Sequence, residues 1–263
     1  MIPCGNERIM QRVRRAAHLW LFLDYDGTLA DFAATPDEIL PDEELISLVT
    51  ALAERPDIRV TIISGRRLAH IQALLPVSGI LKAGSYGLEM ETANGDMVHQ
   101  SEYETIRPQL NKLKREWSGL LSGRDGFYLE DKGWTLAIHA KDAGEEEATD
   151  VLREARRQVR ALLDQDRDGL FRLLGGHRFL ECGPQTADKK RAVEYILVAY
   201  PWHEDVLVVY LGDDDKDEVA FTAVHRNGGL TRAVGDRLRN SSADCWLPSP
   251  QAVRQWLQAV LDR

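Results

Sequence analysis

Four short, mainly apolar runs constrain what this chain can fold into more than any other feature of its sequence. The runs are residues 19–23, 58–63, 80–83 and 206–211. Apolar runs without polar alternation are typical of parallel strands that are covered on both faces. Segments with the apolar spacing of helices lie between them, at 41–55, 67–75 and 189–199. Strands that alternate with helices predict an α/β fold with a doubly wound, mainly parallel sheet.

The middle of the chain follows a different order. Residues 102–121 and 144–163 have the spacing of amphipathic helices, and each is followed by two short strand-like stretches joined by a turn. The stretches are 127–130, 134–139, 170–174 and 178–182. Helix-strand-strand order, found twice, predicts a small α+β domain inserted into the α/β core. We therefore expect a core of residues 1–101 and 185–263, and an inserted domain of residues 102–184.

Charge and cysteine content exclude several classes of partner. The chain carries 33 Lys and Arg against 42 Asp and Glu, a net charge of −9, which suits neither nucleic acid nor an anionic membrane. No stretch approaches the ~20 apolar residues of a membrane span. Basic residues at 12–15 precede an apolar run, but this run ends in acidic residues without a cleavage site, which argues against a signal peptide. The three cysteines, Cys4, Cys182 and Cys245, are odd in number and widely spaced, so we expect a cytoplasmic protein.

Three of the apolar runs end in residues with carboxylate, hydroxyl or guanidinium groups. These are Asp24 and Asp26 after the first run, Ser64 and Arg66 after the second, and Asp213, Asp214 and Asp217 after the last. In an open α/β sheet the ligand crevice lies outside the carboxyl ends of the strands. We therefore expect these side chains to share one edge of the sheet.

Clustered carboxylates repel one another unless a cation lies between them. An all-oxygen set of ligands suits Mg²⁺, which keeps some of its waters and bridges to phosphate. A carboxylate beside such a cation can act as a nucleophile toward phosphorus. This chemistry also needs a lysine to neutralise the phosphoryl oxygens. Lys189 is the leading candidate, because it begins a predicted helix directly after Asp188.

Each of these features also has an ordinary structural interpretation. The segment 24–27 could be a simple turn, and Ser64 could cap a helix. The acidic run at 213–218 could be the start of a helix, where negative charge is favourable, and Lys189 could be a surface lysine. All four features would then have to meet at one sheet edge by chance. Their joint occurrence favours a phosphoryl-transfer site.

The four segments resemble the four motifs of the haloacid dehalogenase superfamily of phosphatases, and the insert resembles that superfamily's larger cap domain. The motifs are Asp24-Tyr25-Asp26-Gly27-Thr28, Ser64-Gly65-Arg66, Lys189, and Gly212-Asp213-Asp214 with Asp217. The resemblance is closer still to the trehalose-6-phosphate phosphatases. It extends over residues 21–29 with Pro36, 63–66, 84–89, 129–139, 181–189 and 212–221.

The resemblance implies roles for individual core residues. Asp24 would attack phosphorus, and Asp26 would protonate the leaving oxygen and then activate water. Ser64 and Lys189 would hold the phosphoryl oxygens, with help from Arg66. Mg²⁺ would be bound by Asp24, by the backbone carbonyl of Asp26 and by Asp213, with Asp214 and Asp217 as further or outer ligands.

The resemblance also implies roles in the cap. Glu130, Lys132 and Glu181 would bind the hydroxyls of a sugar phosphate, although all three could be solvated charges on strands. Trp134 and His139 could line the same site, but packing roles are the more ordinary interpretation. We expect a monomer that acts on a sugar phosphate and has neither nucleic-acid nor membrane partners.

Four residues depart from the family pattern. Tyr86 stands where a His is expected, Lys190 replaces a Gly, Lys216 replaces a Thr, and Gly183 stands where an Arg is common. The catalytic set is unaffected, so the substrate is the open question. Trehalose 6-phosphate is expected. The alternatives are glucosylglycerol phosphate, sucrose phosphate and mannosyl-3-phosphoglycerate. A non-catalytic phosphosugar-binding protein is a further alternative, but a pure binder would not need both Asp24 and Asp26.

Overall fold

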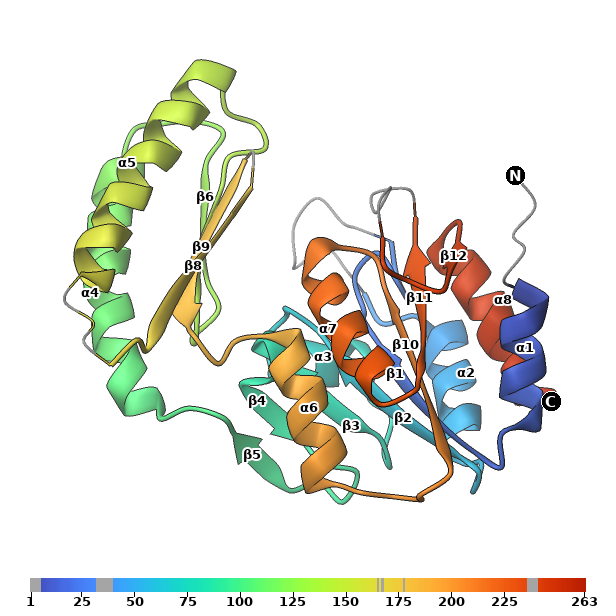
Figure 1. The fold of residues 1–263 in the computed structure, drawn as a ribbon. Coiled ribbons are helices and arrows are strands. Elements are labelled where there is room, and N and C mark those ends of the chain that lie inside the picture. Colours follow the sequence, from blue (N-terminus) through green and yellow to red (C-terminus); the bar gives the residue numbers. More distant parts are fainter. Residues whose placement is uncertain (1–5, 32–39, 165, 167, 177, 236–240) are drawn as a thin grey trace. The chain divides into compact units, whose positions relative to one another are not determined.

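The computed structural model describes residues 6–31, 40–164, 166, 168–176, 178–235 and 241–263 (Figure 1). The chain divides into two compact units, Met1–Val98 with Asp188–Arg263, and His99–Ala187. We call the first the core unit and the second the cap unit. The cap unit extends a few residues beyond each end of the 102–184 expected from the sequence. Cys4 and Pro36 lie outside the described residues.

The core unit is built on an eight-stranded sheet with the order β12-β11-β10-β1-β2-β3-β4-β5. The strands are β1 (His18–Leu23), β2 (Ile58–Ile63), β3 (Leu81–Gly84), β4 (Glu89–Glu91), β5 (Met97–His99), β10 (Val206–Gly212), β11 (Leu230–Val234) and β12 (Cys245–Leu247). The six strands from β12 to β3 pair in parallel, and β4 runs antiparallel to β3. The four predicted strands are confirmed, and they are the four consecutive central ones. The predicted α/β fold with a mainly parallel sheet is therefore confirmed.

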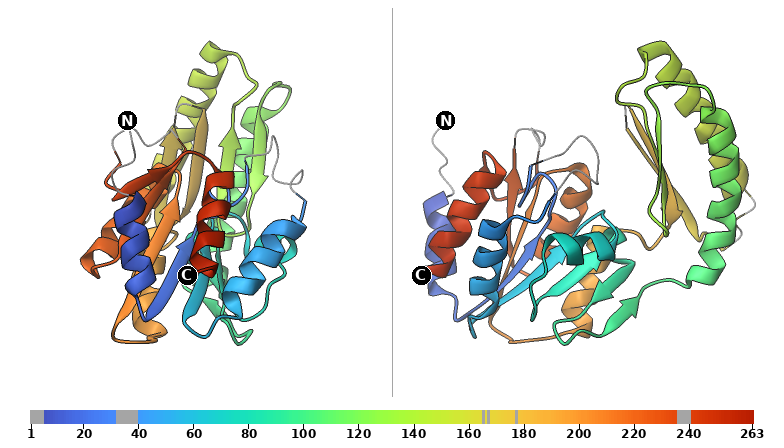
Figure 2. Two further views of the ribbon diagram at one scale, coloured as in Figure 1. Left: turned by 90° about the vertical axis from the view of Figure 1, so that its right-hand side faces the viewer. Right: turned by 180° about the vertical axis from the view of Figure 1, so that it is seen from behind.

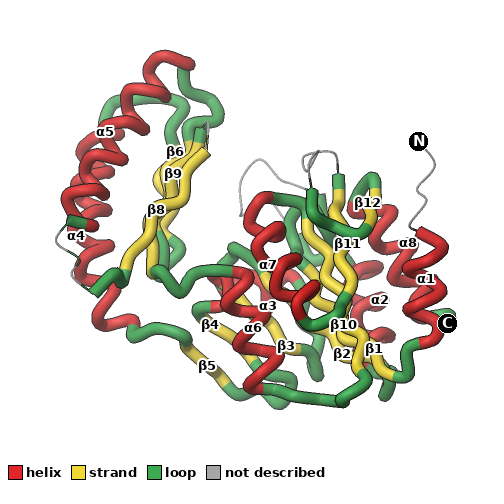
Figure 3. The backbone as a smooth tube through the Cα atoms, in the orientation of Figure 1, coloured by secondary structure: helices red, strands yellow, loops and turns green. Residues whose placement is uncertain are grey.

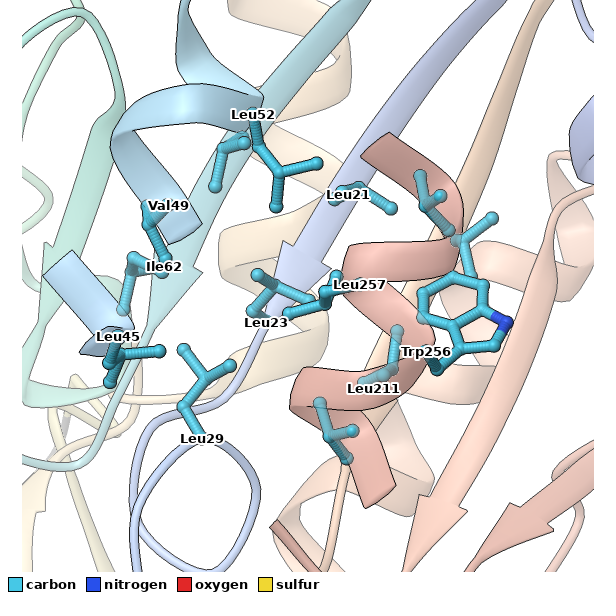
Figure 4. Close-up of a cluster of buried hydrophobic side chains, with 14 of the residues drawn as sticks. Leu21, Leu23, Leu29, Leu45, Val49, Leu52, Ile62, Leu211, Trp256 and Leu257 are labelled. Atoms are coloured by element: carbon cyan, nitrogen blue, oxygen red, sulfur yellow. The ribbon is translucent and has the colours of Figure 1, made fainter. Parts of the chain in front are cut away.

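Helices cover both faces of this sheet. Successive side chains of a strand point to opposite faces, and here both sets are largely apolar and become buried under helices. Leu21 and Leu23 of β1 belong to a buried cluster with Leu257, which Figure 4 shows, whereas Phe22 belongs to the cluster on the other face. Residues of α1 (Asn6–Arg15), α2 (Glu43–Ala53), α3 (Leu68–Leu74) and α8 (Pro250–Leu261) join the first cluster. Residues of α6 (Lys189–Ala199) and α7 (Asp215–Arg226) join the second (Figure 2). Burial on both faces thus explains why these strands are mainly apolar.

Several elements of the core unit were not expected from the sequence. They are the helices α1 and α8 and the strands β4, β5, β11 and β12. The strands among them have three to five residues, and they lie toward the edges of the sheet. Such short segments carry little periodicity, and pairing with a longer neighbour defines them.

The cap unit contains a four-stranded antiparallel sheet. Its two helices are long, and Figure 3 shows them in red beside the yellow strands. Its elements are α4 (Tyr103–Leu121), β6 (Tyr128–Asp131), β7 (Leu136–His139), α5 (Glu145–Leu163), β8 (Phe171–Gly176) and β9 (Phe179–Pro184). Both predicted helices and both predicted strand pairs are confirmed. The strand order β6-β7-β9-β8 joins the two pairs through β7 and β9, which the sequence did not indicate.

One face of the cap sheet forms the core of this unit. Leu136 and Ile138 of β7 pair with Cys182 and Leu180 of β9, and all four are buried together with Trp117 of α4 and other residues of both helices. Ala137 and Glu181, which alternate with them along β7 and β9, point to the opposite face. Among the helices in the described part of the chain, none combines the length and the apolar character that crossing a bilayer requires.

Candidate active site

The structure brings the residues predicted at the strand ends to one edge of the core sheet. Asp24 directly follows β1, Ser64 follows β2, and Asp213 follows β10. In the sheet, β1 lies between β10 and β2, and it pairs in parallel with both. Since parallel neighbours end at the same edge, the three loops meet there. This prediction from the sequence is confirmed.

The loop after β1 is a tight turn that buries Asp24 and exposes more of Asp26. The backbone carbonyl of Tyr25 accepts hydrogen bonds from the amides of Leu29 and Ala30, at 2.8 and 3.0 Å. Gly27 has φ of +79°, a conformation that residues with a Cβ rarely adopt. The turn interpretation of this segment is therefore correct, and the turn also places the two carboxylates, whose chemical roles stay predictions.

Lys189 lies at the centre of the buried charges. Its ammonium donates to Asp24 Oδ1 at 2.8 Å and to Asp217 Oδ1 at 2.7 Å, and all three side chains are buried. Lys189 is the first residue of α6, whose N-cap Asp188 accepts a hydrogen bond from the Arg191 amide. The helix start thus fixes the position of Lys189, and the surface interpretation of this lysine is wrong.

Asp217 serves as the anchor for Lys189. Besides the ammonium, its carboxylate accepts hydrogen bonds from the Tyr210 hydroxyl at 2.7 Å and from the amides of Asp213 and Asp214 at 3.1 and 3.2 Å. A Cβ on Gly212 would lie 2.2 Å from Asp217 Cγ, so only glycine fits before Asp213. The resemblance implied that Asp217 is a further or outer metal ligand, which stays a prediction, and its hydrogen bonds add a positioning role.

Asp214 combines two of the interpretations open from the sequence. Its side chain accepts from the Lys216 amide, and it forms a capping box with Asp217 at the start of α7. The acidic run is therefore a helix start as well as a cluster at the site. Burial alone would raise the pKa of Asp214. The charges of Lys189 and Lys216 and the hydrogen bonds of Asp214 outweigh burial, so its pKa lies below the ordinary value.

The buried charges shift one another's protonation equilibria. Burial raises the pKa of Asp24 to about 7, and although Lys189 opposes this shift, Asp213 and Asp214 add to it. Burial would lower the pKa of Lys189, but Asp217 and Asp24 together hold it well above its ordinary value. One ammonium is thus shared between two buried carboxylates, which leaves the cluster with an excess of negative charge.

Asp26 and Arg66 form a second ion pair at this edge. The Arg66 guanidinium donates to both oxygens of Asp26, with its Nε 2.7 Å from Oδ2 and its Nη2 2.8 Å from Oδ1. The amide of Arg66 donates to Ser64 Oγ at 3.1 Å, and Ser64 is buried. Arg67 is the N-cap of α3, so Ser64 does not cap that helix.

Three carboxylates are close enough together to share a cation. One oxygen each of Asp24, Asp213 and Asp217 lies within 4.8 Å of the others, and all three residues are buried. A buried, all-oxygen set with excess negative charge fits a hard divalent ion. The residues at this edge therefore fit a metal site of that class.

The three predicted cap residues also lie together, on the face of the cap sheet opposite its helices. Glu130 pairs with Ala137, which in turn pairs with Glu181, so the two acidic residues flank a small side chain in one row across three strands. The Lys132 ammonium is 3.3 Å from Glu181 Oε1 and 3.8 Å from Glu130 Oε2. Both Lys132 and Glu181 are buried, so they are not solvated surface charges.

Neighbouring cap residues hold this cluster in place. Thr135 donates to Glu181 at 2.6 Å, and His139 Nε2 is 2.9 Å from Glu130 Oε2. Burial would raise the pKa of Glu130, but the hydrogen bond with His139 and the charge of Lys132 lower it. Trp134 packs edge-on against Tyr103 at 5.0 Å between ring centroids, which agrees with a packing role.

Sequence reasoning missed two residues that hold these sites together. Tyr210 reads as part of an apolar strand, yet it donates to Asp217. Thr135 reads as a polar residue before β7, yet it donates to Glu181, and its side chain would lie 2.4 Å from a Cβ on Gly183. That contact accounts for the glycine where the family pattern has Arg. Neither residue carries a signal in the linear sequence beyond its polar atom.

The fold and the buried Asp24–Lys189–Asp217 arrangement define a phosphatase of the haloacid dehalogenase superfamily. The model of the family described as trehalose-phosphatase matches residues 22–245. The chain therefore belongs to the trehalose-phosphatase family.

Individual relatives agree with this assignment. The chain is 31% identical to a trehalose-phosphate phosphatase of Mycobacterium marinum, over 90% of this chain and 60% of the relative. It is 26% identical to trehalose 6-phosphate phosphatase RA3 of Zea mays, over 92% of this chain and 70% of the relative. The chain thus spans about two thirds of the length of these curated relatives.

A solved structure shares the fold. It is the C-terminal domain of a C. albicans trehalose-6-phosphate phosphatase, with a TM-score of 0.84 at 18% identity, covering 99% of this chain and 98% of that one.

Proposed function

We propose that this chain hydrolyses trehalose 6-phosphate to trehalose and phosphate through a phosphorylated Asp24. Membership of the trehalose-phosphatase family supports the substrate. The observation that carries the chemistry is the buried ammonium of Lys189 between Asp24 and Asp217. An ammonium in this position holds one Asp24 oxygen and leaves the other for attack.

In the first step, the Asp24 carboxylate forms an oxygen–phosphorus bond while the bond from phosphorus to the sugar oxygen breaks. Asp26 donates a proton to that leaving oxygen. Lys189 and Ser64 stabilise the charge on the phosphoryl oxygens. In the second step, Asp26 takes a proton from water, the water oxygen attacks phosphorus, and the bond to Asp24 breaks to release phosphate.

The ion pair between Arg66 and Asp26 has to open before Asp26 can transfer a proton in this mechanism. Asp26 accepts hydrogen bonds from two nitrogens of the guanidinium, so both of its oxygens are engaged by Arg66 and not available to the leaving oxygen. Phosphate is an equally good partner for a guanidinium. We therefore expect Arg66 to exchange Asp26 for a phosphoryl oxygen when substrate binds, which frees Asp26 for proton transfer.

Mg²⁺ is the proposed metal. Asp24, Asp213 and the backbone carbonyl of Asp26 would hold it, with Asp214 and Asp217 close by. When bound, it neutralises charge on the carboxylates and on the phosphoryl oxygens. The chain's own residues perform the proton transfers and the nucleophilic attack.

The cap cluster of Glu130, Lys132 and Glu181 is proposed to bind the hydroxyls of the sugar. Charged acceptors and an ammonium donor are suited to a polyol, and the hydrogen bonds from Thr135 and His139 orient them before substrate arrives. In this proposal, residues 1–101 and 185–263 perform the chemistry, and residues 102–184 select the substrate.

A panel of sugar phosphates tests the function. Purified protein with Mg²⁺ should release phosphate from trehalose 6-phosphate with a kcat/KM at least about tenfold higher than from glucosylglycerol phosphate, sucrose phosphate or mannosyl-3-phosphoglycerate. A higher value for another sugar would assign that substrate instead. Binding of the sugar phosphates without any release would identify a phosphosugar-binding protein.

The monomeric state and the cytoplasmic location stay predictions. Light scattering after size-exclusion chromatography tests the first, and fractionation of the source cells tests the second. The described cysteines, Cys182 and Cys245, are both free thiols, which supports a reducing compartment.

A further inference from the structure

Two of the residues that depart from the family pattern contact each other at the active-site edge. Lys216 Nζ donates to the Tyr86 hydroxyl at 2.8 Å and lies 4.9 Å from the centre of the Tyr86 ring. The two residues are 130 positions apart in the chain. They belong to the core unit, Tyr86 after β3 and Lys216 in the first turn of α7.

Tyr86 is held against the loop that carries Ser64 and Arg66. A Cβ on Gly65 would lie 2.7 Å from Tyr86 Cε1 and 2.9 Å from its hydroxyl oxygen, so the ring rests directly on the Gly65 backbone. Tyr86 has φ of +61°, and Ser85 before it has φ of +49°. Residues other than glycine rarely adopt a positive φ, and backbone strain of this kind is concentrated at functional sites.

Lys216 lies where a helix disfavours positive charge. It is the second residue of α7, between Asp215 and Asp217, and cations are unfavourable at a helix N-terminus. Its ammonium reaches across to the Tyr86 hydroxyl, on the ring that covers Gly65. The pair therefore connects the start of α7, after β10, with the segment after β3, whose Tyr86 ring covers Gly65 in the loop after β2. In the sheet, β1, which Asp24 follows, lies between β10 and β2.

The charges of the site indicate that a further cation would help to neutralise the phosphoryl group of the substrate. Lys189 is shared by two carboxylates, and Arg66 is held by Asp26. A dianionic phosphoryl group that approaches Asp24, Asp213 and Asp214 meets like charge. Lys216 is half-buried, whereas Lys189 is buried.

We propose that Lys216, positioned by Tyr86, is a second cation for the phosphoryl group of the substrate and supplements Lys189 in binding it. The proposal rests on the phosphatase function proposed above, and it assigns Lys216 a binding role and Tyr86 a positioning role.

The test measures binding of inorganic phosphate to the Mg²⁺-loaded protein by calorimetry, together with KM and kcat for trehalose 6-phosphate. The variants are Lys216→Met, Tyr86→Phe and the double variant. Lys190→Met is the matched control, because Lys190 is also a lysine in the first turn of a helix and its ammonium lies 3.9 Å from Glu194 Oε1, within its own helix.

Loss of a charge-assisted hydrogen bond predicts that Lys216→Met weakens phosphate binding and raises KM by about tenfold, with kcat changed less than about threefold. Tyr86→Phe should weaken binding by about threefold, and the double variant should bind as Lys216→Met does, because Tyr86 acts through Lys216. Lys216→Arg should restore most of the affinity. Lys190→Met should bind as the unchanged protein does.

Two results would overturn the proposal. If Lys216→Met binds phosphate as tightly as the unchanged protein, Lys216 does not contact the phosphoryl group. If the effects of Lys216→Met and Tyr86→Phe multiply, Tyr86 does not position Lys216. Should Lys216→Met fail to fold, Lys216→Gln provides the same readout. Because phosphate binding needs no turnover, a failure of trehalose 6-phosphate as substrate would be seen separately.

Discussion

The core unit and the cap unit both gather buried charges, but they hold them by different means. In the core unit, backbone groups fix the geometry: the turn at Gly27, the amides of Asp213 and Asp214, and the helix start at Lys189. In the cap unit, side chains hold one another across a sheet, as in the contacts of Glu181 with Thr135 and Lys132. A backbone-held site tolerates few changes, whereas a cluster of side chains can be altered one residue at a time. The comparison predicts that variants in the core unit change the rate of phosphate release from every substrate. Variants in the cap unit should change which sugar phosphate is hydrolysed.

Asp24→Asn should have the largest effect. Phosphate release from every substrate should fall by about 10⁴-fold or more, because the amide cannot form the oxygen–phosphorus bond. The fold should remain, and the thermal midpoint should stay the same or rise, because the variant removes a buried charge that burial and neighbouring carboxylates disfavour. Near-normal activity would remove Asp24 as the nucleophile.

Removal of the metal should also abolish the phosphatase activity of the core unit. Treatment with EDTA should abolish phosphate release, and added Mg²⁺ should restore it, because the carboxylates of Asp24 and Asp213 repel the phosphoryl group once the metal no longer neutralises them. Circular dichroism before and after treatment provides the control for folding. Activity that is indifferent to chelation would contradict the metal site.

Glu181→Gln should distinguish the role of the cap unit in sugar selection from the role of the core unit in the chemistry. It removes the charge beside Lys132 but keeps an acceptor for Thr135, so kcat/KM for trehalose 6-phosphate should fall by about 10²-fold. Release from p-nitrophenyl phosphate, which offers no sugar hydroxyls, should change less than about threefold. Glu147→Gln, in an exposed ion pair of the cap unit, is the matched control. Equal losses on both substrates would place Glu181 in the chemistry rather than in sugar selection.

Asp131→Asn should have the smallest effect, on stability in acid. The hydrogen bond from Arg107, helped by Lys114 and the Gly133 amide, holds the pKa of Asp131 well below its usual range. A lowered pKa means that this stabilisation is complete above the unfolded value of about 4 and is lost as the pH falls below it.

The free energy of unfolding should therefore be lower in Asp131→Asn than in the unchanged protein at pH 7, and the difference should shrink below pH 4. Urea titrations over this pH range measure it. Asp150→Asn, at an exposed pair within α5, should show no such trend. A difference that does not depend on pH would show that packing, and not the ion pairs, stabilises Asp131.

The sequence by itself determined the central strands, the insert and the catalytic edge. These follow from local patterns: apolar runs mark buried strands, and polar residues directly after them must lie at the strand ends. Asp24, Ser64 and Asp213 could therefore be grouped from their positions in the chain alone. The short strands β11 and β12 could not be predicted in this way, because pairing with neighbours defines them.

Only the tertiary structure decided which side chains meet. Asp217 was expected only as a further or outer metal ligand, and the contacts with Lys189 and Tyr210 show that it also anchors Lys189. Asp26 and Arg66 lie 40 positions apart, and Lys216 and Tyr86 lie 130 apart, so no local pattern links them. Hydrogen bonds depend on distances of about 3 Å, which packing of distant segments fixes and sequence spacing does not.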